Sequence, residues 1–330
     1  MPKLMPAKLR RAEYLVVMSV VCFIVMALIA SAYGGSEDII SHLRRLTVPV
    51  TVGLLFLSLV NYFARFCRWH LLSRQLRITI TPGRNAIFYV AGFSMTTTPG
   101  KMGEALRLWL MERCHSYGYE RLAPLFVADR LSDVSAMLVL CILGVAGVSG
   151  YEWTIVLLSA VFLIVALPFF YPRPLIAFIG SVHLLIGRRW SRLFATIRRS
   201  VRLTAGLFTR KLFSGNLLLS TAGWLAECIA FYWLLVYFGA PISLQQATFI
   251  FAFSMLAGAV TMLPGGLGGV EAAMLGLLIA LGTEFDVAVA STVLIRATTL
   301  WFSVVLGFLV LPVALRIVRH STIATTPSKA

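Results

Sequence analysis

The sequence predicts an all-α, polytopic integral membrane protein, and three observations support this prediction. Of 330 residues, 59% are apolar and only 13% are charged, whereas a soluble domain carries about 25% charged residues. The mean hydropathy of +0.88 leaves too few charges to cover the surface of a water-soluble fold. Apolar runs long enough to cross a bilayer also recur along the chain.

Six apolar segments approach or exceed the roughly 20 residues that a spanning helix needs. They are Tyr14–Tyr33, Val48–Ala64, Leu122–Val148, Thr154–Tyr171, Asn216–Phe238 and Ala288–Leu315. Basic residues precede the first segment, as in a secretory signal peptide. Its apolar stretch exceeds the usual signal core of about 7–15 residues. We therefore favour an uncleaved first helix over a cleaved signal peptide.

Two further apolar regions, Ala86–Met111 and Ala247–Leu281, are broken by proline-glycine pairs that begin at Pro99 and Pro264. Each half is too short to span the membrane. We expect two re-entrant helical hairpins. Irregular backbone is tolerated at membrane depth only where protein or a water-filled cavity satisfies its peptide groups. The hairpin tips therefore predict a polar site near the middle of the membrane.

Similar motifs occur in both halves of the chain, which predicts an internal repeat. Phe93-Ser94-Met95 corresponds to Phe253-Ser254-Met255, Pro99-Gly100-x-x-Gly103 to Pro264-Gly265-x-x-Gly268, Glu104 to Glu271, and Arg130 to Arg296. We expect residues 1–330 to form a single membrane domain with repeat units at 48–150 and 215–315. The predicted topology inserts the two units in opposite orientations. The two hairpins would then enter from opposite sides.

The net charge of +16 is distributed unevenly between the connections. Most Lys and Arg residues fall on one side, including Arg65, Arg68 and the stretch Arg173–Lys211, whereas the other side holds only Arg44 and Arg45. By the positive-inside rule the basic side and both termini are cytoplasmic. The connection 172–214 has apolar residues at helical spacing. We expect an amphipathic helical stretch on anionic inner-leaflet lipids rather than a nucleic-acid site.

The remaining charged residues are expected at membrane depth, where each costs about 2.5–3.5 kcal/mol if it faces lipid. The cations among them are Lys101, Arg107, Arg130 and Arg296, and the acids are Glu104, Asp129, Asp133, Glu227 and Glu271. These residues should therefore face a protein interior or a water-filled cavity. They are the candidate functional residues.

The first hairpin tip combines hydroxyl groups, backbone amides and cations, which suit a phosphate or carboxylate head group. Helix N-termini after the Pro-Gly breaks would also favour an anion. Alternatively, Glu104 pairs with Lys101 or Arg107 and only holds the hairpin together. We expect substrate contacts from Lys101, Arg107, Arg130, Arg296, Pro99, Gly100, Gly103, Pro264, Gly265 and Gly268, and charge pairing or coupling from Glu104, Asp129, Asp133 and Glu271.

Two alternatives stay open for the acids inside apolar helices. Asp129 and Asp133 lie one turn apart, so one of them could carry a proton, or both could form a salt bridge with Arg130 or Arg296. Glu227 is either a structural carboxyl group or a ligand. The cysteines and histidines are scattered, and we expect no metal, cofactor or catalytic residue. No nucleotide-binding or hydrolase motif occurs, so ATP-driven transport by this chain alone is excluded.

Four motifs together resemble the lysylphosphatidylglycerol synthase transmembrane family, also called the flippase-like domain family. They are Pro99–Arg107 (PGKMGEALR), Asp129–Asp133 (DRLSD), Leu263–Glu271 (LPGGLGGVE) and Ile295-Arg296. The resemblance implies a bacterial or archaeal cytoplasmic-membrane protein that moves a phospholipid, hopanoid or polyprenyl phosphate between leaflets. No soluble aminoacyl-transferase domain is expected after the last span, so lipid aminoacylation is not implied.

The leading hypothesis is a lipid translocase, not an enzyme, in which the hairpin tips form a head-group site near the middle of the membrane. The membrane potential is negative inside, so it does not oppose outward movement of an anionic lipid. Inward movement of one negative charge works against about 2.3 kcal/mol for each 100 mV. One alternative is a lipid-modifying membrane enzyme. Another is a scaffold whose basic connection recruits lipid-biosynthesis enzymes.

Overall fold

The computed structural model describes residues 45–98, 102–115, 117–146, 152–187, 190–207, 210–261 and 263–324. These residues form helices without any strand, in agreement with the predicted all-α class. The α-helices are α3 (Val48–Gln75), α4 (Pro82–Ala91), α5 (Met102–His115), α6 (Tyr119–Val145), α7 (Glu152–Phe170), α8 (Pro172–Leu185), α9 (Ser191–Leu207), α10 (Arg210–Tyr237), α11 (Leu244–Val260), α12 (Gly269–Ala280), α13 (Phe285–Arg296) and α14 (Phe302–Ala324).

Local sequence explains where several helices begin. Proline occupies the first turn of α3, α4 and α8, where its missing N–H removes no helical hydrogen bond. Ser243 caps α11, because its hydroxyl accepts a hydrogen bond from the Gln246 N–H while the Gln246 side chain bonds back to the Ser243 N–H. This reciprocal capping satisfies two amide groups that a helix otherwise leaves free.

Three helical stretches are long and apolar enough to cross a membrane, namely Val48–Gln75, Leu212–Tyr237 and Phe285–His320. The helices Trp153–Leu167 and Pro172–Leu185, bent by 77°, would together make a fourth. A multi-pass membrane protein is therefore supported, while the predicted count of six spans stays a prediction. The predicted span Tyr14–Tyr33 lies outside the described residues. The predicted span Leu122–Val148 corresponds to α6. This helix carries Asp129, Arg130 and Asp133, so it is not among the helices that are apolar enough to cross a membrane by composition alone.

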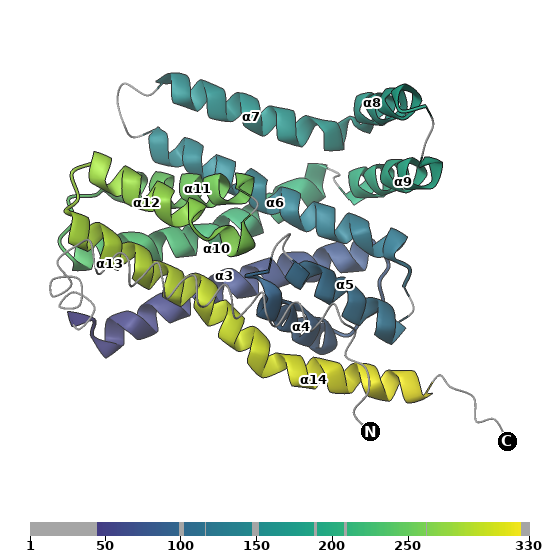
Figure 1. Cartoon of the computed structure of the whole chain (residues 1–330), viewed down its shortest axis with the longest axis horizontal. Helices are drawn as coiled ribbons and strands as arrows, with labels where there is room; N and C mark the ends of the chain where they lie inside the picture. Colours follow the sequence, from purple (N-terminus) through teal and green to yellow (C-terminus); the bar gives the residue numbers. More distant parts are fainter. Residues whose placement is uncertain are drawn as a thin grey trace.

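Short helices occupy both predicted hairpin regions. In the second, α11 and α12 are apolar, too short to span, and packed against each other (Figure 1). In the first, α4 continues into the 3-10 helix Gly92–Met95, and α5 follows the break. The two tips approach one another, because a Cβ atom built on Gly265 would lie 3.5 Å from the Thr97 Cα. The inverted orientation of the repeat units stays a prediction.

The helices pack around two apolar clusters. One includes Phe231 on α10 and Phe251 on α11, and the other includes Trp69 on α3 and Tyr89 on α4. Helix α14 packs on the first hairpin so closely that a Cβ atom on Gly307 would lie 2.1 Å from the Ser94 nitrogen. Helices α7, α8 and α9 form a layer along one edge of the bundle, against α6 (Figure 1).

Candidate functional site

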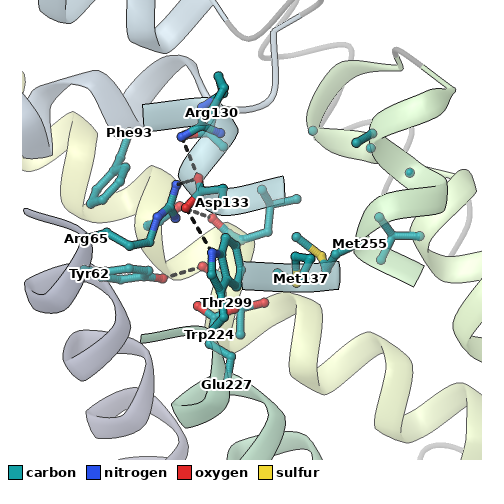
Figure 2. Close-up of a pocket in the computed structure, with 18 of the residues that line it drawn as sticks. Tyr62, Arg65, Phe93, Arg130, Asp133, Met137, Trp224, Glu227, Met255 and Thr299 are labelled. Atoms are coloured by element: carbon teal, nitrogen blue, oxygen red, sulfur yellow. Dashed lines mark hydrogen bonds and ion pairs between the residues drawn. The ribbon is translucent and has the colours of Figure 1, made fainter. Parts of the chain in front are cut away.

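A cavity of about 160 Å³ lies where the two apolar clusters meet, and residues of both hairpins line it. Phe93 and Thr96 come from the first hairpin, and Met255 and Gly265 come from the second. Figure 2 shows the polar side chains that enter this space from the long helices between the hairpins. The arginines among its lining residues are Arg65, Arg107, Arg130 and Arg296.

Three arginines and two aspartates form an ion-pair cluster on one side of the cavity. We name this set the Arg/Asp cluster, and its members are Arg65, Arg68, Asp129, Arg130 and Asp133. Asp133 Oδ2 lies 3.1 Å from Arg65 Nη2 and 2.8 Å from Arg130 Nη2, and its Oδ1 lies 2.7 Å from Arg68 Nη1. Asp129 pairs with Arg68 and, at 2.9 Å, with Arg130. The contacts with Arg130 correspond to the predicted salt-bridge alternative for the two aspartates, whereas Arg296, the other predicted partner, pairs with Glu271.

The prediction that Arg65 and Arg68 lie in a basic connection beyond the end of a span is wrong, because the structure places both within a helix. Helix α3 continues to Gln75 instead of ending near Ala64. The Arg68 side chain is consequently fully buried, and 12% of the Arg65 side chain is exposed. Burying an arginine without a partner of opposite charge is costly, and Asp129 and Asp133 on α6 supply such partners for Arg65 and Arg68.

Arg296 at the end of α13 fixes the second hairpin tip. Its Nε donates to Glu271 Oε1 at 2.6 Å, and its Nη2 donates to the Gly265 carbonyl oxygen at 2.8 Å. The other carboxylate oxygen of Glu271 accepts from the Gly268 N–H at 2.7 Å. Gly265 and Gly268 both adopt positive φ, at 63° and 85°, a conformation that glycine adopts without steric cost.

Arg107 reaches the cavity from the first hairpin, where aromatic rings surround it. Its Nε donates to the Tyr89 carbonyl oxygen at 3.0 Å, and its guanidinium carbon lies 3.9 Å from the centre of the Tyr89 ring. Phe93 contributes a second ring at 5.1 Å. Such cation–π contacts stabilise a positive charge that is partly removed from water.

A π-helix, Ala297–Trp301, follows Arg296 directly. Segments of this kind leave the regular hydrogen-bond pattern and often occur at functional sites. The Tyr62 hydroxyl donates to the Thr299 carbonyl oxygen within this segment. Both Tyr62 and Thr299 line the cavity (Figure 2). The sequence contains no periodicity that indicates this local change of helix type.

Helix α10 contributes Trp224 and Glu227, which lie three residues apart and therefore on one face. The Trp224 Nε1 donates to Asp133 Oδ1 at 3.0 Å, and the Arg65 guanidinium carbon lies 4.7 Å from the Trp224 ring centre. Glu227 lines the cavity below Trp224 (Figure 2). The sequence already identifies Glu227 as a candidate, and its spacing of three residues from Trp224 is the signal that points to Trp224 on the same face of the helix.

The structure brings many of the candidate residues together at the cavity, but several lie outside the described residues. The candidate residues that line the cavity are Arg107, Arg130, Asp133, Gly265 and Arg296. Two further candidates contact these arginines, Asp129 with Arg130 and Glu271 with Arg296. Pro264 begins a 3-10 helix, and Gly268 precedes α12. Pro99, Gly100 and Lys101 are not described, and Gly103 and Glu104 are placed only as backbone of α5.

The arrangement suits binding of an anion more directly than metal chemistry. Within the described ranges, no group of three His, Cys, Asp or Glu side chains could hold a metal ion. Four arginines, in contrast, line one cavity together with aromatic and methionine side chains. A guanidinium group forms charge-assisted hydrogen bonds with phosphate and carboxylate oxygens. The cavity therefore combines a wall that carries arginines with an apolar one.

The fold and the cavity define a helical membrane protein with a charged site between broken helices. The model of the family described as "Lysylphosphatidylglycerol synthase TM region" matches residues 14–307. The chain belongs to this family, as its motifs predicted.

Two archaeal relatives are similar to most of the chain. A "UPF0104 membrane protein" of Methanothermobacter thermautotrophicus is 25% identical, and the match covers 92% of this chain and 95% of the relative. "UPF0104 membrane protein PH1989" of Pyrococcus horikoshii is 21% identical over 86% of this chain and 92% of its own length.

Proposed function

We propose that this protein is a lipid translocase that binds an anionic head group in the cavity between the two hairpins. The observation that carries the proposal is the convergence of Arg65, Arg107, Arg130 and Arg296 on a cavity lined by both hairpins. The cavity is small, so it would hold a phosphate-bearing head group while the acyl or prenyl chains stay in lipid. The proposal involves binding and movement of the lipid, with no covalent step.

The head group would compete with acids that hold the arginines when the site is empty. Arg130 pairs with Asp129 and Asp133, and Arg296 pairs with Glu271. An entering phosphate could take hydrogen bonds from these arginines without a net loss of ion pairs. The exchange of one anionic partner for another would keep the binding energy modest, which a translocase needs in order to release its substrate.

The proposal also includes the orientation of the protein in the membrane and the lipids that it contacts. The basic connections and both termini lie in the cytoplasm, following the distribution of Lys and Arg. Helices α8 and α9 rest on anionic inner-leaflet lipids, and the exposed apolar residues Trp190, Leu193 and Phe178 support this placement. The lipid substrate is a phospholipid, a hopanoid or a polyprenyl phosphate of a bacterial or archaeal cytoplasmic membrane.

Leaflet exchange in liposomes tests the proposal. Purified protein is reconstituted with fluorescent phosphatidylglycerol, and the fraction of label that a membrane-impermeant reductant reaches is followed over time. We expect exchange above that of protein-free liposomes, and a large loss in Arg130→Ala. The matched control is Arg113→Ala, because the Arg113 side chain is 56% exposed and does not line the cavity.

Two outcomes would contradict the proposal. If no anionic phospholipid or polyprenyl phosphate exchanges, and the protein instead converts a lipid chemically, it is a membrane enzyme. If function in cells is lost when Arg198, Arg199 and Arg202 on α9 are replaced, but survives Arg130→Ala, the scaffold role with lipid-biosynthesis enzymes is favoured.

A further inference from the structure

Among the acids that the structure describes around the cavity, Glu227 is the one whose carboxylate has no hydrogen-bond or ion-pair partner. The residue is only 3% exposed, and it lines the cavity. In the part of the chain that the structure describes, no hydrogen bond or ion pair reaches the Glu227 carboxylate. An acidic side chain of this kind is costly to bury in its charged form.

The three neighbouring acids are already compensated by arginines. Asp129 and Asp133 belong to the Arg/Asp cluster, and Glu271 lies 2.6 Å from Arg296 Nε. Protonating any of these acids would break at least one of these ion pairs. Glu227 could gain or lose a proton without breaking any described ion pair.

Charged and titratable groups face Glu227 from several helices. Two arginines act electrostatically on Glu227, and both already have other partners. Arg65 contacts Asp133 and the Trp224 ring, and Arg296 pairs with Glu271. On α11, the lining residue Met255 carries no titratable group. The groups that face Glu227 are Tyr62 and Arg65 on α3, Asp133 on α6, Arg296 on α13 and Cys228 on its own helix.

We propose that Glu227 is the proton-binding site of this cavity and that it takes up a proton when an anionic lipid head group binds. An ionised Glu227 would repel the entering anion across the same small space, because like charges disfavour each other when buried. A neutral Glu227 leaves Arg65 and Arg296 free of this competing negative charge. The proton comes from water that reaches the cavity, and it leaves again when the lipid leaves.

This inference rests on the proposed function and adds a coupling ion to it. One anionic lipid and one proton would cross together, so the pair carries no net charge for a monoanionic head group. The membrane potential would then neither drive nor oppose the movement. A difference in proton concentration across the membrane would drive it. The direction of transport would follow the gradients of the lipid and the proton.

Calorimetry on the full chain in detergent micelles tests the inference. The probe is short-chain phosphatidylglycerol, whose phosphodiester stays monoanionic across the pH range used. Repeating the titration in buffers of different ionisation enthalpy gives the number of protons taken up. At pH values above the point at which Glu227 ionises in the empty protein, we expect about one proton per bound lipid and an affinity that falls by about tenfold for each pH unit.

The variant Glu227→Gln mimics the protonated residue, so it should bind the lipid with no proton uptake and no pH dependence. The control Glu284→Gln changes an exposed acid and should behave like the wild type. Lipid binding without proton uptake by the wild-type protein, at pH values at which Glu227 is ionised in the empty protein, would overturn this inference alone. Failure of the wild type to bind the lipid would overturn the proposed function together with it.

A measurement on the wild type alone covers the case in which Glu227→Gln does not fold. Infrared difference spectra with and without a diether analogue of the lipid, which has no ester carbonyl group, should gain the carbonyl band of a protonated carboxylic acid at a pH at which Glu227 is ionised in the empty protein. The absence of this band would overturn the inference.

Discussion

The Tyr62 hydroxyl donates a hydrogen bond to the Thr299 carbonyl oxygen, and this contact joins α3 to the π-helix that follows Arg296. Tyr62 belongs to the first predicted repeat unit and Thr299 to the second. The contact therefore links the two halves of the chain directly at the cavity wall. It also satisfies a carbonyl group in a segment that departs from regular helical bonding.

Replacing Tyr62 by phenylalanine should destabilise the protein by about 0.5–1.5 kcal/mol, the usual net value of a hydrogen bond. The aromatic packing on Phe93, at a centroid distance of 5.1 Å, would remain. Thermal unfolding in detergent measures the loss. The control is Tyr232→Phe, since no hydrogen bond to the Tyr232 hydroxyl is found within the described residues. Equal stability of the two variants would contradict the prediction.

The variant Arg68→Gln should lose about 3–5 kcal/mol of stability, because it leaves Asp129 and Asp133 buried with fewer cations. Chemical unfolding in detergent gives the free energy. Adding Asp129→Asn should recover part of the loss, since it removes one of the uncompensated charges. The surface variant Arg84→Gln should change stability by less than about 0.5 kcal/mol. Stability losses that simply add in the double variant would contradict the ion-pair explanation.

Adding a methyl group at Gly307 should destabilise the packing of α14 on the first hairpin. The new Cβ would lie 2.1 Å from the backbone nitrogen of Ser94, so the helix must shift. We expect a cost of about 1–3 kcal/mol, typical of overpacking, measured as a lower thermal midpoint. At Gly276 no atom lies within 4 Å of the added Cβ, and Gly276→Ala should instead be neutral or stabilising.

Lysine at position 296 should weaken lipid exchange even though the positive charge is kept. One ammonium group cannot replace the two directed bonds from Arg296 to Glu271 and to the Gly265 carbonyl oxygen. Losing a hydrogen bond of this charged type costs about 1.5–3 kcal/mol, or about tenfold or more in rate. The liposome assay measures the rate, with the exposed Arg316→Lys as control. Unchanged exchange in Arg296→Lys would show that charge alone suffices.

Much of this architecture could be predicted from the sequence because apolar length and Pro-Gly breaks act locally. The break at Pro264 and the one-turn spacing of Asp129 and Asp133 both appear in the structure. The site was harder to predict, because its ion pairs join residues far apart in the chain. Arg68 and Asp129 are 61 positions apart, and a helix that continues past Ala64 places Arg68 inside the protein.

The layer formed by α7, α8 and α9 has a mechanical consequence. It contacts the rest of the bundle chiefly through α6 (Figure 1). The same helix carries Asp129, Arg130 and Asp133, so a single helix connects the outer layer to the ion pairs of the cavity. Changes in bilayer thickness or lateral pressure that tilt the layer would shift the position of these three charges. Lipid composition could in this way adjust how strongly the arginines are held.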